Sequence, residues 1–429
     1  MPDLSCARAP VNPSRLQSMM DELSSYGGGP DGSMTRLTLS REDGAARDWL
    51  GRWFAANGFV QSIDAIGNQF GRMSLAGANE PVIMVGSHID SQPNGGRFDG
   101  ALGVVSACEA VLAVSERLRT ESRLSACNFQ VVNWTNEEGA RFQPSLLGSS
   151  VFAGATELEW ALDRADGDGV TVRKSLEQIG YAGKDKVMRP DALIELHIEG
   201  DKYLFEANER FGVFTRFWGA TKYRLAVLGR QAHTGATPMA ERKDALLGAA
   251  YLIADLKQIA GEHGLDLHTS VGRLEVFPNS PNTVPSEAVL FIELRSGSPE
   301  VLAEAERKMK VRMEAAAARA GVTCEVRAID RRKAGSFASG LITLAEQTAA
   351  AFGETARHLD TIGGHDAVAM SAVCPSVVLA VRSRNGVIHH PTEFTSPADQ
   401  AFGTQVLADM LYAIATEGLR ATNMKEAAA

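Results

Sequence analysis

The sequence predicts an α/β protein with a mixed, mostly parallel sheet covered by helices on both faces, and with a smaller inserted domain. Short apolar stretches alternate with helical patterns in the first half of the chain, which is typical of a largely parallel sheet. From about residue 212 the order becomes strand–helix–strand–strand–helix–strand, which describes a small antiparallel sheet with two helices on one face. A length of 429 residues, 45% of them hydrophobic, fits two globular domains.

The first half of the chain supplies the predicted parallel sheet. Its expected elements are strands at 81–88, 128–136 and 191–199 and a helix at 99–119. The apolar residues of that helix share one stripe, made by Leu102, Val105, Cys108 and Leu112. Asp99 or Gly100 is expected near its N-cap. Ligands of such sheets bind beyond the carboxyl ends of the strands, so polar residues there are candidates for a site.

The second half of the chain supplies the inserted domain and then returns to the first. The expected elements are a strand at 213–229, either continuous or interrupted, a helix at 239–264, strands at 267–277 and 287–295, a helix at 298–321 and a strand at 322–330. Gly321 is expected at the C′ position of its helix. A helix near 339–352 and a strand at 375–381 complete the first domain. The predicted domains are therefore 1–211 with 331–429, and 212–330.

Composition argues against several classes of protein. A net charge of −9 gives no reason to expect nucleic acid or a membrane surface as a partner. No apolar run approaches the roughly 18 residues of a membrane span, and the N-terminus lacks the pattern of a secretory signal. The five cysteines are scattered and odd in number, which predicts free thiols in a reducing cytoplasm: Cys6, Cys108, Cys127, Cys324 and Cys374.

The stretch "GSHIDSQPNGGRFDGALG" (86–103) brings an imidazole and two carboxylates to one strand end. Asp90 lies two residues after His88, a position from which a carboxylate could hold the second nitrogen of the imidazole. Asp99 taken alone could be a helix N-cap, and His88 taken alone could be a surface histidine. Their proximity in the sequence favours a functional site.

Two adjacent glutamates, Glu137 and Glu138, follow the strand in "VVNWTNEEGARF" (131–142). Taken alone, such a pair is more often a solvated acidic turn. A divalent cation would change the repulsion between the two side chains into attraction. One carboxylate could then bind the metal while the other accepts a proton from water.

Two further segments add histidines to the candidate site. His197 ends a strand in "ELHIEG", and "GVIHHPTEF" contains His389, His390 and Glu393. A lone histidine such as His197 is more often a core residue. The combined set offers imidazole and carboxylate ligands, which suit Zn, Mn, Co or Ni better than Ca or Mg. Two ions about 3.5–4 Å apart could bind if one carboxylate bridges them. The set is His88, Asp99, Glu138, His197 and His389.

The chain resembles the metal-dependent amidohydrolases of the M20 peptidase clan, and within it the hydantoinase/carbamoylase family. That family contains N-carbamoyl-L-amino acid hydrolases, allantoate amidohydrolases and β-ureidopropionases. The resemblance runs from about residue 36 to about residue 395. The matching stretches are "RLTLSREDGAARDWL", "DAIGNQFGR", "GSHIDSQPNGGRFDGALGV", "NEEGARF", "LLGSSVFAG", "ELHIE", "GRQAHTGATPM", "PNSPNTVP", "GGHDAVAMS" and "HHPTEF".

The resemblance implies a role for each candidate residue. It implies five ligands for two divalent metal ions, with Asp99 bridging: His88, Asp99, Glu138, His197 and His389. Glu137 would be the general base and Asp90 the partner of His88. His233, Asn282 and Arg295 would contact substrate, with His233 stabilising the oxyanion and Arg295 clamping a carboxylate. His389 is preferred to His390 because the family's ligand lies two residues before a proline and four before a glutamate.

The resemblance also implies an activity and an assembly. The expected reaction is hydrolysis of an amide or ureido C–N bond in a small carboxylate-bearing substrate, foremost an N-carbamoyl-L-amino acid or related ureido acid. The inserted domain would close over substrate and form a homodimer, and the enzyme is expected in the cytoplasm. The alternatives are an aminopeptidase or N-acyl amino acid deacylase, an aromatic amine deaminase, and a binding protein without activity.

Two departures from the family pattern bear on specificity. The family usually continues "HIE" with Gln-Gly, where this chain has Gly200 and Asp201, and that glutamine is implicated in holding the ureido end of the substrate. Ile388 stands where the family usually has a serine before the ligand histidine. His365 and Asp366, in "GGHDAVAMS", receive no role.

Overall fold

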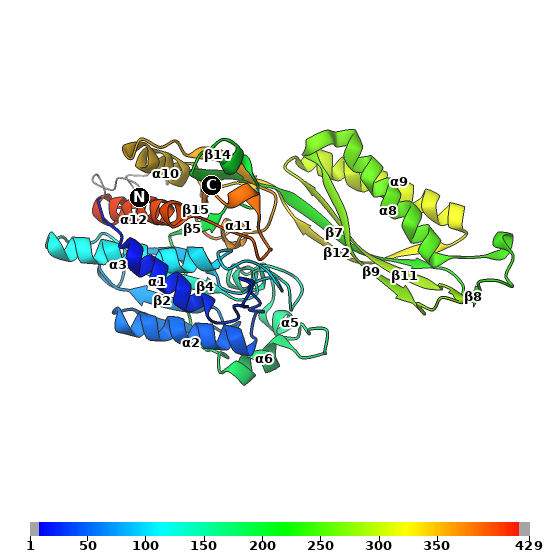
Figure 1. Ribbon diagram of the computed structural model, residues 1–429, viewed down its shortest axis with the longest axis horizontal. Coiled ribbons are helices and arrows are strands. Elements are labelled where there is room, and N and C mark those ends of the chain that lie inside the picture. The colour runs from blue at the N-terminus through cyan, green and yellow to red at the C-terminus, as the bar shows by residue number, and fades with distance from the viewer. Residues whose placement is uncertain (1–7, 420–429) are drawn as a thin grey trace. The chain divides into compact units, whose positions relative to one another are not determined.

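The computed structural model describes residues 8–419, which divide into two compact units (Figure 1). The first unit contains residues 8–215, 337–359 and 363–419, and the second contains residues 216–336 and 360–362. Cys6 lies outside the described residues. The functional roles predicted for the two domains stay predictions.

The first unit is built on a mixed sheet whose strand order is β1-β2-β4-β3-β5-β15-β6-β13, with β14 paired to β6. By residue number, β13 and the last residues of β6 and β14 fall in the second unit. The four central strands β4, β3, β5 and β15 are parallel, and the flanking pairs β1–β2, β2–β4, β15–β6 and β6–β13 are antiparallel. The strands are β1 (Val60–Ile63), β2 (Gln69–Met73), β3 (Val82–His88), β4 (Asn128–Trp134), β5 (Ala192–Ile198), β6 (Phe211–Phe217), β13 (Gly335–Ser336), β14 (Arg357–Thr361) and β15 (Ser376–Val381). This architecture confirms the predicted fold class.

Every residue of β3, β4, β5 and β15 is buried, because helices cover the sheet on both faces. The helices of the first unit are α1 (Pro13–Ser24), α2 (Arg41–Ala56), α3 (Ala101–Thr120), α4 (Leu147–Phe152), α5 (Leu158–Leu162), α6 (Val172–Ile179), α7 (Tyr203–Glu206), α10 (Ser339–Ala351), α11 (Asp366–Met370), the 3-10 turn η3 (Arg384–Gly386) and α12 (Pro397–Glu417). Ile194 and Leu196 of β5 join the apolar core with α3 and α12. Glu195 lies between these two residues and points to the opposite face of the sheet. Its carboxylate accepts a hydrogen bond from the backbone N–H of Ala367, in the first turn of α11.

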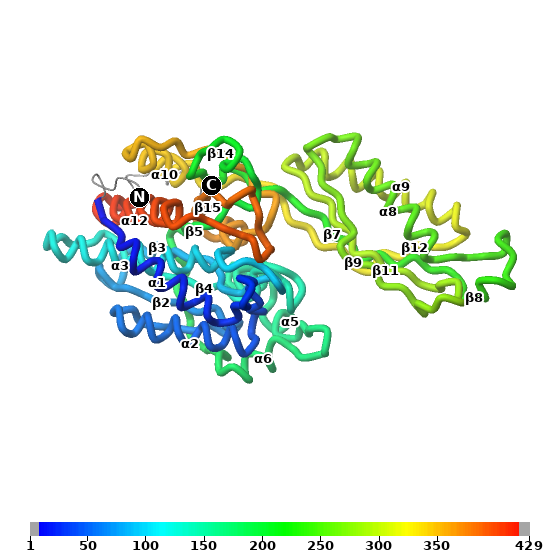
Figure 2. The backbone as a smooth tube through the Cα atoms, viewed as in Figure 1, coloured from blue at the N-terminus to red at the C-terminus, as the bar shows by residue number. Residues whose placement is uncertain are grey.

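Helix α3 differs from the expected single apolar stripe, because it is buried on nearly all sides. Helices α1 and α12 pack against it, so its outward residues are covered as well. The backbone trace in Figure 2 shows α1, in blue, and α12, in red, close together beside α3. A helix this central gives the loop before it a rigid support.

The second unit contains a four-stranded antiparallel sheet of order β12-β7-β11-β9. Its elements are β7 (Gly219–Leu228), β8 (Ala232–His233), η1 (Met239–Glu241), α8 (Ala245–His263), η2 (Gly264–Asp266), β9 (His268–Phe277), β10 (Thr283–Val284), β11 (Glu287–Ser296), α9 (Pro299–Ala320) and β12 (Thr323–Arg332). Helices α8 and α9 share one apolar core with this sheet. The main elements follow the predicted βαββαβ order, and Gly321 ends α9 in the left-handed conformation.

The strand expected at 213–229 is interrupted at Trp218, which separates β6 from β7. One predicted boundary in this region was wrong. The helix expected at 239–264 begins at Ala245, because the side chain of Asp244 accepts a hydrogen bond from the backbone N–H of Leu247. Elsewhere the described cysteines Cys108, Cys127, Cys324 and Cys374 are free thiols. Within residues 8–419 no helix is both long and apolar enough to cross a bilayer.

Candidate metal centre and active site

The candidate ligands come from loops and strand ends of the first unit. His88 is the last residue of β3, His197 is the penultimate residue of β5, and Glu138 follows β4 by four residues. Asp99 immediately precedes Gly100, the N-cap of α3, and His389 follows β15. Since β3, β4, β5 and β15 run parallel, their carboxyl ends meet at one edge of the sheet. The five residues come together at this edge.

Asp99 lies at the middle of the cluster. Its Oδ1 is 3.0 Å from His197 Nε2 and 3.8 Å from His88 Nε2. Its Oδ2 is 3.0 Å from His389 Nε2, which is itself 3.3 Å from Glu138 Oε2. The ligand atoms thus form two groups that share one carboxylate: His88, Asp99 and His197, and Asp99, Glu138 and His389. This is the arrangement expected of a carboxylate that bridges two ions.

Gly100 allows Asp99 and His88 to approach each other. A Cβ atom at position 100 would lie 2.3 Å from ring atoms of His88, and the φ angle of Gly100 is 63°. Both facts require glycine at this position. No side chain caps the N-terminus of α3. Asp99 therefore faces the histidines instead of serving as the N-cap that its sequence position allowed.

Backbone carbonyl groups orient two of the imidazoles. His88 Nδ1 donates to the carbonyl oxygen of Asp90 and His197 Nδ1 to that of Ile198, each at 2.9 Å. A carbonyl oxygen can only accept, so these nitrogens carry the protons and Nε2 is the nitrogen that meets the cluster. The Asp90 carboxylate lies 3.5 Å from His88 Nδ1 and accepts from the backbone N–H groups of Glu137 and Glu138, each at 3.4 Å.

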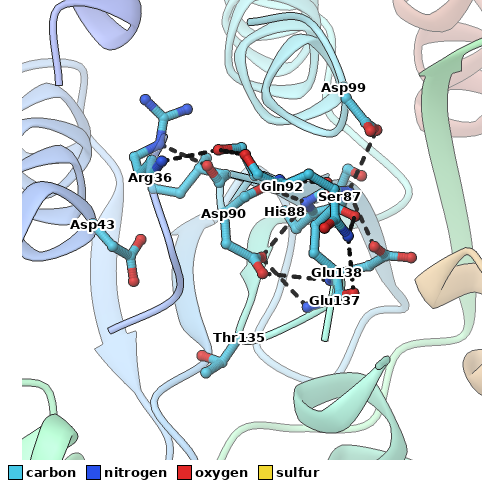
Figure 3. Close-up of polar contacts among 12 residues, drawn as sticks. Arg36, Asp43, Ser87, His88, Asp90, Gln92, Asp99, Thr135, Glu137 and Glu138 are labelled. Atoms are coloured by element: carbon cyan, nitrogen blue, oxygen red, sulfur yellow. Dashed lines mark hydrogen bonds and ion pairs between the residues drawn. The ribbon is translucent and has the colours of Figure 1, made fainter. Parts of the chain in front are cut away.

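The two adjacent glutamates have different surroundings (Figure 3). Glu138 is held by Gln92, whose backbone N–H donates to Oε1 at 3.1 Å and whose amide Nε2 donates to Oε2 at 2.9 Å. Glu137 is 9% exposed, and its Oε2 lies 3.5 Å from His88 Nε2. Glu138 is therefore fixed within the second ligand group, whereas Glu137 lies beside His88 of the first.

Burial and charge act in opposite directions on the titration of the cluster. Burial raises the pKa of Glu137 well above its ordinary value, although the nearby His88 opposes this. Burial would also raise the pKa of Asp99, but hydrogen bonds from His197 and His389 bring it well below the usual range. Hydrogen bonds to Asp99 and Glu138 raise the pKa of His389 to about 11. A bound cation would have to displace protons from these imidazoles.

The side chains fit a pair of divalent metal ions. Within residues 8–419, the buried Nε2 atom of His88 has no hydrogen-bond partner, which is costly unless another group occupies that position. Imidazole and carboxylate donors without thiolate suit Zn, Mn, Co or Ni. Three imidazoles and two carboxylates supply enough donors for two ions when Asp99 is shared.

The residues expected to contact substrate lie in the second unit. His233 pairs with Thr283, the residue after Asn282, in the small β8–β10 ladder. Its Nδ1 accepts hydrogen bonds from the N–H groups of Gly235 and Ala236, each at 3.0 Å, so Nε2 carries the proton and can donate. Arg295, in β11, forms an ion pair of 2.9 Å with Glu293. The roles of these residues stay predictions.

The residues next to the predicted ligands are also placed. His390 is exposed, and its Nδ1 lies 2.8 Å from the hydroxyl of Thr392, whereas the neighbouring His389 faces Asp99. The His365 ring centroid lies 4.5 Å from that of His197. Asp366 is fully buried at the start of α11, and burial raises its pKa well above the ordinary value.

Two residues that hold the candidate ligands received no role from the sequence: Gln92 was missed, and Glu393 was named but left out of the candidate set. Gln92 donates two hydrogen bonds to the carboxylate of Glu138. Glu393 Oε1 accepts from the backbone N–H groups of Phe98, at 2.8 Å, and Asp99, at 3.1 Å. Both lie inside stretches that were singled out, "GSHIDSQPNGG" and "HHPTEF", so their polar side chains were the available signal.

A parallel-sheet edge carrying two groups of candidate metal ligands that share a carboxylate is typical of metal-dependent hydrolases. Comparison with known proteins identifies the family: the chain belongs to peptidase family M20/M25/M40, whose sequence pattern matches residues 84–413. The resemblance drawn from the sequence motifs is confirmed.

Several relatives and solved structures that the chain resembles are amidohydrolases or amidases by name. It is 32% identical to an N-carbamoyl-L-amino-acid amidohydrolase of Rhizobium meliloti, over 92% of this chain and 95% of that one. It is 30% identical to an allantoate amidohydrolase of Bacillus subtilis, over 93% and 97%. A crystal structure of a hydantoinase/carbamoylase family amidase from Burkholderia vietnamiensis matches with a TM-score of 0.89 and 33% identity, over 96% and 99%. The protein is thus an amidohydrolase acting on C–N bonds other than peptide bonds.

Proposed function

We propose that this amidohydrolase hydrolyses the ureido C–N bond of an N-carbamoyl-L-amino acid or a related ureido acid, with two divalent ions bound. The observation that supports this most directly is the shared position of Asp99 between two ligand groups, with Glu137 beside one of them. The names of the N-carbamoyl-L-amino-acid and allantoate amidohydrolases that the chain resembles supply the substrate class.

The proposed mechanism gives each side chain one task. His88, Asp99, Glu138, His197 and His389 would hold the metals. When bound, the metals would supply Lewis acidity that polarises the substrate carbonyl and makes water a better nucleophile. Glu137 would take a proton from the attacking water and return it to the leaving nitrogen. His233 Nε2–H would donate to the developing oxyanion, Asn282 would hold substrate, and Arg295 would bind its carboxylate.

A second candidate activity, N-acyl amino acid deacylation, is favoured by an apolar contact. A Cβ atom at Gly200 would lie 3.5 Å from Ile388 Cδ1 and 3.7 Å from its Cγ2. The two departures from the family pattern therefore adjoin each other, and they lie three residues after His197 and one residue before His389 in the sequence. An isoleucine beside a glycine offers no hydrogen bond to a ureido NH₂ group, whereas it tolerates a methyl group.

Substrate preference separates the two candidates. We expect N-carbamoyl amino acids to be turned over, with kcat/KM raised by about 10-fold in Gly200→Gln, because an added amide can hydrogen-bond the ureido end. The space at position 200 permits a side chain, since the nearest contacts of a Cβ are ordinary van der Waals distances. The measurement is kcat/KM for matched N-carbamoyl, N-acetyl and dipeptide substrates, with Gly200→Ala as the control. A clear preference for the N-acetyl substrates would favour the deacylase instead.

The homodimer, the cytoplasmic location and the identity of the metals stay predictions. The exposed edge strands β9 and β12 of the second unit carry apolar side chains such as Leu274, Phe277 and Ile329, which is compatible with an interface between copies. Sedimentation velocity is expected to give a species of twice the chain mass. A single species of monomer mass at micromolar concentration would exclude the dimer.

A further inference from the structure

Arg36 is a buried cation close to the proposed metal centre. Its side chain is 1% exposed, and its guanidinium hydrogen bonds go to backbone carbonyl oxygens: Nε donates to Ile89 at 2.6 Å, and Nη1 to Leu23 at 2.9 Å and Tyr26 at 2.8 Å. Burial lowers its pKa to about 10, while the negative charges of Asp43 and Asp90 oppose that effect. Removing a charged guanidinium from water costs free energy, so a buried arginine that forms these bonds is a candidate for a specific role.

Three hydrogen bonds connect Arg36 to the segment that follows His88. The Nε bond ends on the carbonyl of Ile89. The backbone N–H of Arg36 donates to Ser91 Oγ at 2.9 Å, and the N–H of Ser91 donates to the carbonyl of Arg36 at 3.0 Å. Figure 3 shows the Arg36 side chain reaching this segment. The residues on both sides of Asp90 are therefore fixed to the same arginine.

Asp90 connects this segment to the candidate site, because it contacts His88 and both adjacent glutamates. Its carbonyl oxygen accepts from His88 Nδ1 and sets the direction of that ring. Its carboxylate accepts from the N–H groups of both Glu137 and Glu138. A displacement of Asp90 would thus move a ligand of the first metal group, a ligand of the second, and the proposed base.

We propose that Arg36 is a positioning residue for the metal centre, which acts through Asp90 to hold His88 and the two adjacent glutamates in place. This inference rests on the proposed metal centre. Groups that orient metal ligands typically change metal affinity or activity by 10–100-fold when they are replaced. A merely structural arginine would lower stability without changing metal affinity.

Arg36→Lys is the decisive variant, because lysine keeps the charge but cannot reproduce the planar fork of donors. The probe is Co²⁺ added to metal-free protein and followed by its visible absorption, which needs no substrate. We expect the affinity for Co²⁺ to fall about 10–100-fold. The matched control is Arg15→Met, which removes a part-buried arginine bound to Glu109 and so loosens the contact between α1 and α3. That control is expected to lower the melting temperature and to keep the affinity.

Two outcomes would overturn the proposal. One is an Arg36→Lys protein that binds Co²⁺ as tightly as the parent protein, whatever its melting temperature. If Arg36→Lys does not fold, Ser91→Ala removes one of the three connecting bonds and is expected to lower the affinity about 3–10-fold. An unchanged affinity in that variant would equally count against the role. If the parent protein itself binds no Co²⁺, the proposed metal centre fails before Arg36 is tested, so the two failures are distinguishable.

Discussion

Glu137→Gln is expected to lower kcat by about 10²–10⁴-fold, the usual contribution of a positioned general base. Glutamine has nearly the same shape as glutamate but cannot accept a proton in this pH range. Glu137 belongs to neither of the two groups of candidate ligands, although its carboxylate lies 3.5 Å from His88 Nε2. The variant should therefore keep its metal ions and its KM while turnover is lost.

The measurement combines metal content by mass spectrometry with steady-state kinetics on the N-carbamoyl substrate that the parent protein turns over best. Glu138→Gln is the matched control, because the same substitution one residue later removes a side chain of the second ligand group. That control should lose metal as well as activity. Unchanged turnover in Glu137→Gln would exclude it as the base, and loss of metal would make it a ligand.

Much of the fold follows from local patterns in the sequence. The apolar runs predicted at 81–88 and 375–381 are the strands Val82–His88 and Ser376–Val381, because a strand buried on both faces has to be apolar throughout. The alanine-rich helix predicted at 298–321 is Pro299–Ala320, since Ser298 caps its start and Gly321 ends it. These signals lie within a few residues of the structure they determine.

The remaining features depend on contacts between distant parts of the chain. The edge strand β1 and its neighbour β2 contain polar residues such as Gln61 and Arg72, so no apolar run marks them. The bond from Phe98 to Glu393 joins residues 295 positions apart, and that from Arg36 to Ile89 joins residues 53 apart. Strand ends show where ligands are expected, but not which polar neighbours will hold them.

Asp99→Asn is expected to have the largest effect on metal binding, because Asp99 is the one residue common to both ligand groups. An amide keeps the shape but loses the charge and one ligand oxygen. Replacing a group that only orients a ligand lowers metal affinity about 10–100-fold. Because Asp99 would itself bind both ions, we expect the affinity for both to fall by more than about 100-fold. Activity should fall with it.

Thermal unfolding with added metal gives a readout that does not need a substrate. At a metal concentration 100 times the parent Kd, each site of the parent protein should gain about 2.7 kcal/mol of stability, and a site weakened 100-fold only about 0.4 kcal/mol. Asp409→Asn is the control, because it changes another buried aspartate, which binds the backbone N–H groups of Arg8 and Ala9. It should lower the baseline stability and keep the gain from metal. An Asp99→Asn protein that still binds two ions with the parent affinity would rule out a shared carboxylate, and with it the paired metal centre.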